Sequence, residues 1–271
     1  MVYLDIASID AETLVALAKE VSEKERRRKL EKFLVKDLST LKPEDVRNIT
    51  PISWIEDIFA CLVFALGIPG AAFTFPPLLI FLGYAFGASF AYGGIALLLI
   101  LAFLPTRFKE SNLYSWASRT ILRYFSFKVI FPDFIPRGRR TILVAPPHGV
   151  FPFGNIVTML AFPSIMGYPF RGIASSAALH APVFRQMLEW IGVVDADRKN
   201  CENILNNDGI IGISTGGVAE VFETDAQTEG DGDECIVLHC RKGLVKLAFR
   251  TGDKKQKTCN TPRVSFIDIN R

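Results

Sequence analysis

The chain has 271 residues, enough for one sizeable domain and an accessory segment. Hydrophobic residues make up 49% of it and the mean hydropathy is +0.26, which favours a membrane-associated segment over a fully soluble enzyme. The net charge of +3 is too small to indicate a nucleic-acid partner. Five cysteines without a CxxC pair, together with three histidines, argue against a structural metal site, so we expect reduced cytosolic thiols and no metal.

The first 53 residues predict an N-terminal helical region. Apolar residues recur at helical spacing from Ala11 to Leu38, which predicts one amphipathic helix. Lys and Arg are concentrated between Lys24 and Lys36, with Glu interspersed. This pattern leaves two interpretations open: a surface that binds anionic lipid headgroups, or an ordinary solvated helix with Glu–Lys pairs.

A long apolar run follows, in which no charged residue occurs between Asp57 and Arg107. As one helix it would span about 70 Å, whereas the hydrocarbon core of a bilayer is about 30 Å thick. The sequence therefore predicts a transmembrane hairpin over residues 54–106, with arms at 54–75 and 78–104 and a turn near Pro76-Pro77. Basic flanks on both sides predict that both termini are cytosolic. A buried pair of core helices is the alternative.

In residues 107–271, predicted strands alternate with predicted helices, as in an α/β domain. We expect a mixed or parallel sheet with flanking helices, and a ligand site beyond the carboxyl ends of its strands. The predicted strands are 141–145, 171–175, 209–214 and 236–239, and the predicted helices are 155–162, 181–191 and 243–249.

His148 directly follows the first predicted strand of this domain, between Pro147 and Gly149. The proline stiffens the loop, and the glycine permits a close approach of a substrate. An imidazole titrates near neutrality and can remove the proton of an alcohol that attacks a thioester. His148 is therefore a candidate general base, although a histidine merely packed in a loop gives the same pattern.

Two further blocks follow later strands. Gly216 and Gly217 expose backbone N–H groups that could hold an oxyanion or a phosphate, and Glu220 would lie in the first turn of the helix that follows. Arg241 and Lys242 could pair with the phosphates of coenzyme A. The alternatives are a capped tight turn and a surface charge pair. Arg198-Lys199-Asn200, with Asn200 as a possible helix cap, invites the same two interpretations.

A different chemistry is suggested by Gly212-Ile-Ser214-Thr-Gly216, which matches the G-x-S-x-G turn of serine hydrolases. That mechanism needs a later acid and a later histidine. Only His239 follows in the sequence, and a five-residue pattern arises easily by chance, so we expect the match to be a chance one.

Together, four blocks resemble the diacylglycerol acyltransferase type 2 family, which includes monoacylglycerol and wax-alcohol acyltransferases. The resemblance runs from about Trp116 to Gly252. Its carriers are the blocks 145–154, 184–200, 216–220 and 241–248, in this order and spacing. The resemblance implies a glycerolipid-acyltransferase-like sheet, acyl-CoA as co-substrate without a bound cofactor, and esterification of diacylglycerol or a related lipid alcohol. It also implies an endoplasmic reticulum membrane location, and a homo-oligomer is a possible assembly.

Residue by residue, the resemblance implies the following roles. His148 falls on the catalytic histidine, with Pro147 and Gly149 as its neighbours, while Pro146 replaces a first histidine of that block. Glu220 is a candidate to orient the base. The remaining matches are Gly216 and Gly217 on the glycine block, Arg241 and Lys242 on the basic block, and Tyr124-Phe125 on a Tyr-Phe-Pro block in which Ser126 replaces the proline.

The C-terminal segment departs from the family pattern. After Gly252, an apolar strand is replaced by the polar stretch Asp253 to Lys257, which predicts a C-terminally incomplete domain whose missing strand exposes its neighbours. A non-catalytic truncated paralogue or partner of an active enzyme is therefore an alternative to the acyltransferase.

Overall fold

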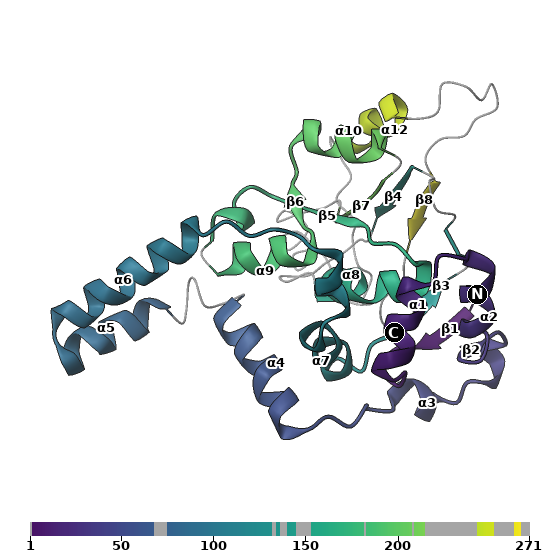
Figure 1. The fold of residues 1–271 in the computed structure, drawn as a ribbon, viewed down its shortest axis with the longest axis horizontal. Helices are drawn as coiled ribbons and strands as arrows, with labels where there is room; N and C mark the ends of the chain where they lie inside the picture. The colour runs from purple at the N-terminus through teal and green to yellow at the C-terminus, as the bar shows by residue number, and fades with distance from the viewer. Residues whose placement is uncertain are drawn as a thin grey trace, which may run out of the picture.

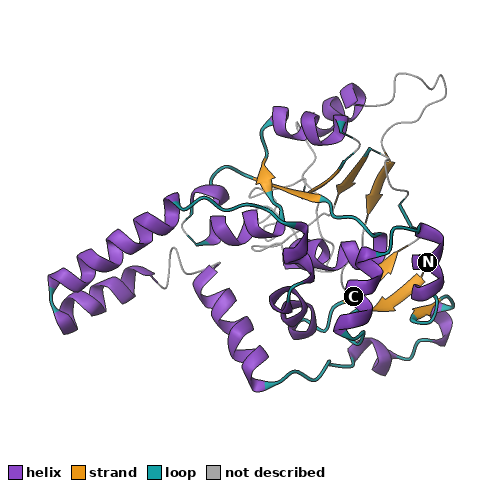
Figure 2. Ribbon diagram, viewed as in Figure 1, coloured by secondary structure: helices purple, strands orange, loops and turns teal. Residues whose placement is uncertain are grey.

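The structure is a computed structural model that describes residues 2–67, 75–131, 134–135, 140–144, 153–181, 183–207, 209–214, 243–251 and 263–266. Figure 1 shows a body with two sheets, from which a helical hairpin projects. One sheet is parallel and the other antiparallel, with helices packed around them (Figure 2). The predicted α/β class is confirmed.

The parallel sheet forms the frame of the C-terminal half. In spatial order its strands are β6 (Val194–Asp195), β5 (Arg171–Ala174), β7 (Ile210–Ile213), β4 (Thr141–Val144) and β8 (Arg263–Phe266). Three of these strands lie within a residue or two of their predicted bounds. The predicted strand 236–239 lies outside the described residues.

Alternate residues of the central strands face opposite layers, as the pleat of a strand requires. Leu143 of β4 packs in the cluster that includes α8 (Phe153–Met166), while Ile142 and Val144 face α10 (Arg198–Asn206) and α12 (Gly243–Thr251). Each of these layers therefore covers one face of the sheet. The remaining helices of this half are α9 (Phe184–Ile191) and the short 3-10 turn η4 (Ala178–His180).

The N-terminal region is not the single helix that the sequence predicts. It forms strand β1 (Val2–Asp5), helices α1 (Ala11–Lys19) and α2 (Glu23–Leu30), strand β2 (Leu34–Val35), the 3-10 turn η1 (Leu38–Thr40) and α3 (Pro43–Arg47). Helix α1 ends because Glu20 is extended, and Ser22 starts α2 by accepting a hydrogen bond from the Glu25 N–H.

This region is also part of the main body. Strand β1 pairs antiparallel with β2 and with β3 (Lys128–Phe131), which follows α7 (Trp116–Tyr124) and the 3-10 turn η3 (Glu110–Tyr114). Leu4 and Leu17 are buried in the same cluster as Val129 and the α8 residue Leu160. Helix α8 thus lies between the two sheets, and the N-terminal segment covers it.

Arg26 of α2 connects helix α1, the α1–α2 connection and the end of helix α8. Its side chain is only 4% exposed, and its guanidinium donates to the backbone carbonyls of Leu17, Glu20 and Met166. Gly167, which ends α8 with a φ of +80°, lies directly against the guanidinium, where no Cβ would fit. The buried arginine therefore ties α1 to the C-terminal end of α8.

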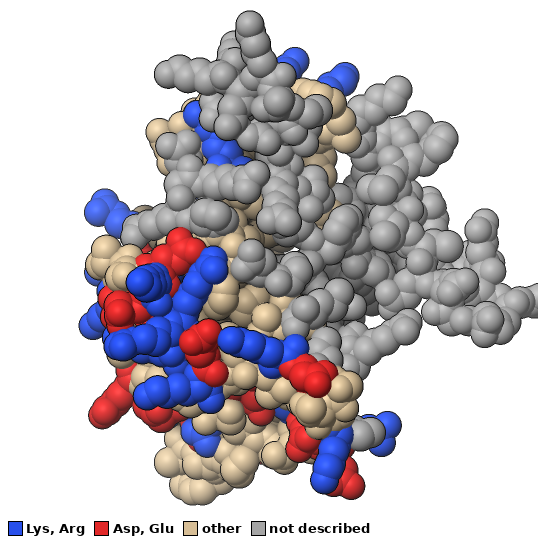
Figure 3. Space-filling view, turned by 90° about the vertical axis from the view of Figure 1, so that its right-hand side faces the viewer, with Lys and Arg blue, Asp and Glu red and all other residues tan. Residues whose placement is uncertain are grey.

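The basic residues between Lys24 and Lys36 mostly pair with neighbouring acids. Figure 3 shows Lys and Arg side chains interleaved with Asp and Glu on this face of the molecule. The ion pairs are Arg27–Glu23 at 2.8 Å, Arg28–Glu25 at 2.8 Å, Lys29–Glu20 at 2.5 Å and Lys36–Glu31 at 3.1 Å. Of the two interpretations left open, the geometry favours the solvated, ion-paired surface.

The described parts of the apolar run, residues 54–67 and 75–106, contain three helices rather than two long arms. They are α4 (Trp54–Gly67), α5 (Phe75–Phe86) and α6 (Ala88–Phe103), and the tight turn is at Gly87 with a φ of +96°. Pro76 and Pro77 begin α5 instead of forming the turn, because a helix tolerates proline in its first turn. Within the described residues, no helix has the length and apolarity needed for a membrane crossing. The predicted transmembrane arms are therefore unsupported.

Strand β8, formed by residues 263–266, lies beside β4 at the edge of the parallel sheet. Thr141 pairs with Arg263 and Val144 with Phe266, in parallel register. A segment beyond the polar stretch 253–257 supplies β8 beside β4. The expectation of a C-terminally incomplete domain stays a prediction. The polar–apolar alternation of β8, Arg-Val-Ser-Phe, covers only four residues, which is too short to predict a strand from the sequence.

Candidate functional site

The predicted site residues lie outside the described residues: His148 with its neighbours Pro147 and Gly149, the block Gly216, Gly217 and Glu220, and the pair Arg241 and Lys242. What the structure describes is the set of helix and strand ends that border these segments. Those ends can be placed relative to one another, and they define a candidate site at one edge of the parallel sheet.

Two of the segments leave neighbouring strands. His148 follows β4, which ends at Val144, and Gly216 follows β7, which ends at Ile213. The two strands are parallel, and Val144 lies directly opposite Ile213. The histidine segment and the glycine segment therefore start side by side at the carboxyl edge of the sheet, where α/β proteins bind their ligands.

The segment that carries Arg241 and Lys242 ends at the same edge, where helix α12 starts. Helix α12 begins at Gly243, directly after Arg241 and Lys242, and its Leu244 and Leu247 pack against the face of β4 and β7. Its last residue, Thr251, accepts a hydrogen bond of 2.8 Å from Arg140, directly before β4 begins. Because the helix ends at the amino edge of the strands, it starts at the carboxyl edge.

Helix α8 meets this edge with its first turn. It begins at Phe153, where the histidine segment ends, and the Asn155 side-chain amide donates to the hydroxyl oxygen of Ser214 at the end of β7. This bond holds the exit of the histidine segment next to the entry of the glycine segment. Asn155 belongs to none of the candidate sites predicted from the sequence, although its place in the first turn after the His148 block is a signal that points to it.

An aromatic cluster supports the start of α8 from outside. The ring centroid of Phe64 on α4 lies 5.2 Å from that of Phe125 and 5.4 Å from that of Phe153, and the Phe125 and Phe153 centroids are 5.6 Å apart. Tyr124 joins the cluster at 5.8 Å from Phe64. Edge-on and tilted pairs at these distances are favourable. Tyr124-Phe125, noted in the sequence only as a partial family block, thus connects the apolar helix α4 to the site.

We expect Phe64→Ala to lower the rate of any reaction at this edge by about tenfold, because the lost ring contacts loosen the position of Phe153 and the adjoining segment. The measurement is the rate per quantity of folded protein, with kcat and KM determined separately. Phe33→Ala is the matched control, since Phe33 is an exposed phenylalanine between α2 and β2, outside both the aromatic cluster and the α5–α6 hairpin. An equal effect of the two substitutions would contradict a positioning role.

The remaining candidates have ordinary structural partners. The side chain of Asp197, not Asn200, caps α10 by accepting from the Lys199 N–H at 3.1 Å, and Arg198 pairs with Glu202 at 2.8 Å. The Ser214 hydroxyl meets Asn155, and within the described residues no histidine is bonded to it. The helix-cap assignment to Asn200 was wrong, and the hydrolase interpretation gains no support from the described contacts.

The fold and the grouped segment ends describe an α/β protein whose candidate chemistry is gathered at the carboxyl edge of a parallel sheet. A family model described as diacylglycerol acyltransferase matches residues 97–257, more than half of the chain. The chain belongs to the diacylglycerol acyltransferase family.

Among curated proteins, the chain is similar to human (Homo sapiens) 2-acylglycerol O-acyltransferase 3, with 27% identity over 142 residues. The aligned region covers 49% of this chain and 40% of the human protein, so the chain spans less than half the length of that relative. No solved structure matches the chain.

Proposed function

We propose that the protein is an acyl-CoA-dependent O-acyltransferase that esterifies an acylglycerol, with diacylglycerol as acceptor and triacylglycerol as product. The observation that supports this most directly is the convergence of three segment ends at one sheet edge: the carboxyl ends of β4 and β7 and the start of α12. A base, an oxyanion site and a phosphate site must be close together for acyl transfer from coenzyme A.

In the proposed reaction, His148 removes the proton of the acceptor hydroxyl as its oxygen attacks the thioester carbonyl. Backbone N–H groups at Gly216 and Gly217 hold the resulting oxyanion, and Glu220 orients the imidazole. The carbonyl then re-forms, the C–S bond breaks, and the coenzyme A thiolate takes the proton from the imidazolium. Pro147 and Gly149 shape the loop, and Arg241 and Lys242 pair with the phosphates of coenzyme A. The scheme needs no acyl-enzyme, metal or bound cofactor.

We also propose that the α5–α6 hairpin brings this site to a lipid surface, on the endoplasmic reticulum membrane. None of the α5 residues is buried, and both helices expose large apolar side chains to their surroundings. Examples are Ile80 and Phe81 on α5 and Leu97, Ile100 and Phe103 on α6, each more than half exposed. Apolar surface of this extent is typical of a segment that contacts lipid. Acceptor and product would then be concentrated where the site opens.

The activity is tested by expressing the full chain in cells that lack neutral-lipid synthesis and supplying their microsomes with labelled oleoyl-CoA. Diacylglycerol, 2-monoacylglycerol and a long-chain alcohol are compared as acceptors, because the name of the human relative makes the monoester the natural competitor. We expect the label to appear in triacylglycerol most rapidly with diacylglycerol. Ester formation at the level of empty-vector microsomes with all three acceptors would refute the proposal.

A further inference from the structure

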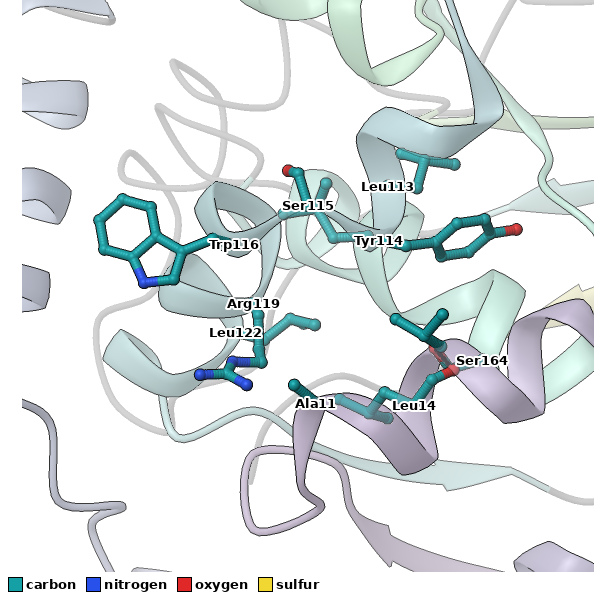
Figure 4. Close-up of a pocket in the computed structure, with 11 residues that line it drawn as sticks. Ala11, Leu14, Leu113, Tyr114, Ser115, Trp116, Arg119, Leu122 and Ser164 are labelled. Carbon is teal, nitrogen blue, oxygen red and sulfur yellow. Dashed lines mark hydrogen bonds between the residues drawn. The ribbon is translucent and has the colours of Figure 1, made fainter.

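A cavity of about 170 Å³ lies where α1, α7 and α8 meet. Figure 4 shows the side chains around it, with Leu14 of α1 below, Ser164 of α8 beside it, and Arg119 of α7 at its margin. Trp116, at the start of α7, is 49% exposed and belongs to the rim. All the residues that line this cavity belong to the described part of the chain.

The cavity is separate from the acyl-transfer edge. Helix α8 starts at that edge with Phe153, whereas the helix residues that line the cavity are Leu160 and Ser164. At 1.5 Å per residue these positions lie roughly 10 and 16 Å further along the helix axis. The cavity therefore lies toward the opposite end of α8, where this helix packs against the N-terminal helix α1.

Most of the lining is apolar, and most of its polar groups already have partners. Leu14, Leu122 and Leu160 are buried members of the main core cluster. The Ser164 hydroxyl donates to the Leu14 carbonyl, and the Ser115 hydroxyl oxygen accepts from the Ser118 N–H. A cavity of about 150 Å³ holds a molecule the size of benzene, so this one has room for about six carbon atoms.

Arg119 is the exception among these polar groups. Its Nε atom is buried and has no hydrogen-bond partner in the described residues. The nearby carboxylate of Glu56 is already engaged, since it accepts from Arg123 at 2.7 Å and from the Ser53 N–H at 2.9 Å. Because Nε is buried, a ligand in the cavity can reach only the terminal nitrogens of this guanidinium, and an anion is the ligand that guanidinium N–H groups bind most strongly.

We propose that this cavity is a second ligand site, which binds the carboxylate end of a fatty acid. The carboxylate accepts hydrogen bonds from Arg119, and the first carbons of the chain lie against Leu14, Leu122 and Leu160. One guanidinium matches the single charge and planar shape of a carboxylate. The site does not depend on the proposed acyl transfer, because none of its residues belongs to the acyl-transfer edge.

The first test measures binding to the purified full chain in phosphatidylcholine nanodiscs by isothermal titration calorimetry. The probes are octanoate, octanol and octyl phosphate. We expect octanoate to bind, octanol to bind much more weakly, and Arg119→Gln to weaken octanoate binding by about tenfold or more, because a hydrogen bond to a charged group is lost. Arg28→Gln is the matched control, since Arg28 is an exposed arginine on α2. Tighter binding of octyl phosphate than of octanoate would overturn the choice of a carboxylate.

A second test does not require the arginine variant to fold. Octanoate that carries a photoreactive diazirine is crosslinked to the unmodified chain, and the labelled residues are identified by mass spectrometry. We expect labels in α1, in residues 113–122 and in the second half of α8, with the yield reduced by Ala11→Leu, which fills the cavity from its margin. Labelling confined to other parts of the chain, or unchanged by Ala11→Leu, would rule out this site.

Discussion

His148→Ala is expected to reduce acyl transfer by a factor of about 10² to 10⁴, the usual contribution of a positioned general base. Without the imidazole, the acceptor hydroxyl keeps its proton while it attacks the thioester, and the barrier rises accordingly. We expect the amount of folded protein in the membrane fraction to be unchanged, since the substitution removes only a side chain in the segment between β4 and α8. The measurement is the initial rate of labelled triacylglycerol formation in microsomes with matched protein levels.

The matched control for this result is His180→Ala. His180 lies in the exposed turn η4, and a ring nitrogen of its imidazole bonds to the Ser176 carbonyl at 2.5 Å, an ordinary structural partner. We expect this variant to keep nearly full activity. If the His148 variant also kept its activity, another group would have to be the base. If both variants lost activity together, a general effect on the preparation would be the explanation.

Arg26→Met is expected to lower the free energy of unfolding by about 3–5 kcal/mol, the loss typical of breaking a buried polar network. Methionine keeps much of the volume but removes the donor to the buried carbonyls of Leu17 and Met166 and to the partly buried carbonyl of Glu20. Arg26→Lys should recover only part of the loss, because one ammonium cannot match the planar fork that reaches three acceptors. Urea denaturation followed by circular dichroism gives the comparison.

Arg28→Met serves as the control for stability. Arg28 lies two residues further along α2, and its side chain is 73% exposed in an ion pair with Glu25. Exposed pairs of this kind contribute about 0–1 kcal/mol, so the midpoint should hardly move. Equal shifts for the two methionine variants would show that the buried hydrogen bonds do not tie α1 to α8.

The contacts at the two ends of α8 have different consequences for function. Arg26 holds the C-terminal end of α8, and the aromatic cluster with Asn155 holds its start. We therefore expect Arg26 variants to change stability first, and Phe64 variants to change the rate first. The distinction follows from distance along a rigid helix, because only the start of α8 borders the segment that carries His148.

The strands and helices that were predicted between residues 141 and 251, and that fall within the described residues, could be predicted from the sequence because short-range patterns decide them. The strands after Arg140 and before Ser214 are buried apolar runs bounded by turn residues, and Gly243 to Thr251 has apolar residues at helical spacing. The family blocks around His148, Gly216 and Arg241 are also local in sequence. The meeting at one edge of the strand and helix ends that border these blocks could be anticipated from the rule that parallel strands bind ligands beyond their carboxyl ends.

The N-terminal half could not be predicted in the same way because long-range partners decide it. Residues 11–38 have helical periodicity throughout, yet helix α1 ends at Lys19, and the strand β2 follows helix α2. Strand β2 pairs with β1, which also pairs with the distant β3. The cluster of cations resembles a membrane-binding face in sequence. In the structure, one arginine is buried and four other basic side chains pair with neighbouring acids.

By itself, then, the sequence determined the α/β class, the central strands of the parallel sheet and the family to which the chain belongs, because these depend on periodicity and on motifs of a few residues. Only the tertiary structure decided the turn of the apolar hairpin at Gly87, the strand β8 beside β4, and the cavity between α1, α7 and α8 with Arg119 in its lining. The physical reason is that a left-handed turn, a strand partner and an unfilled space each depend on which distant segments meet, and local patterns carry little information about such meetings.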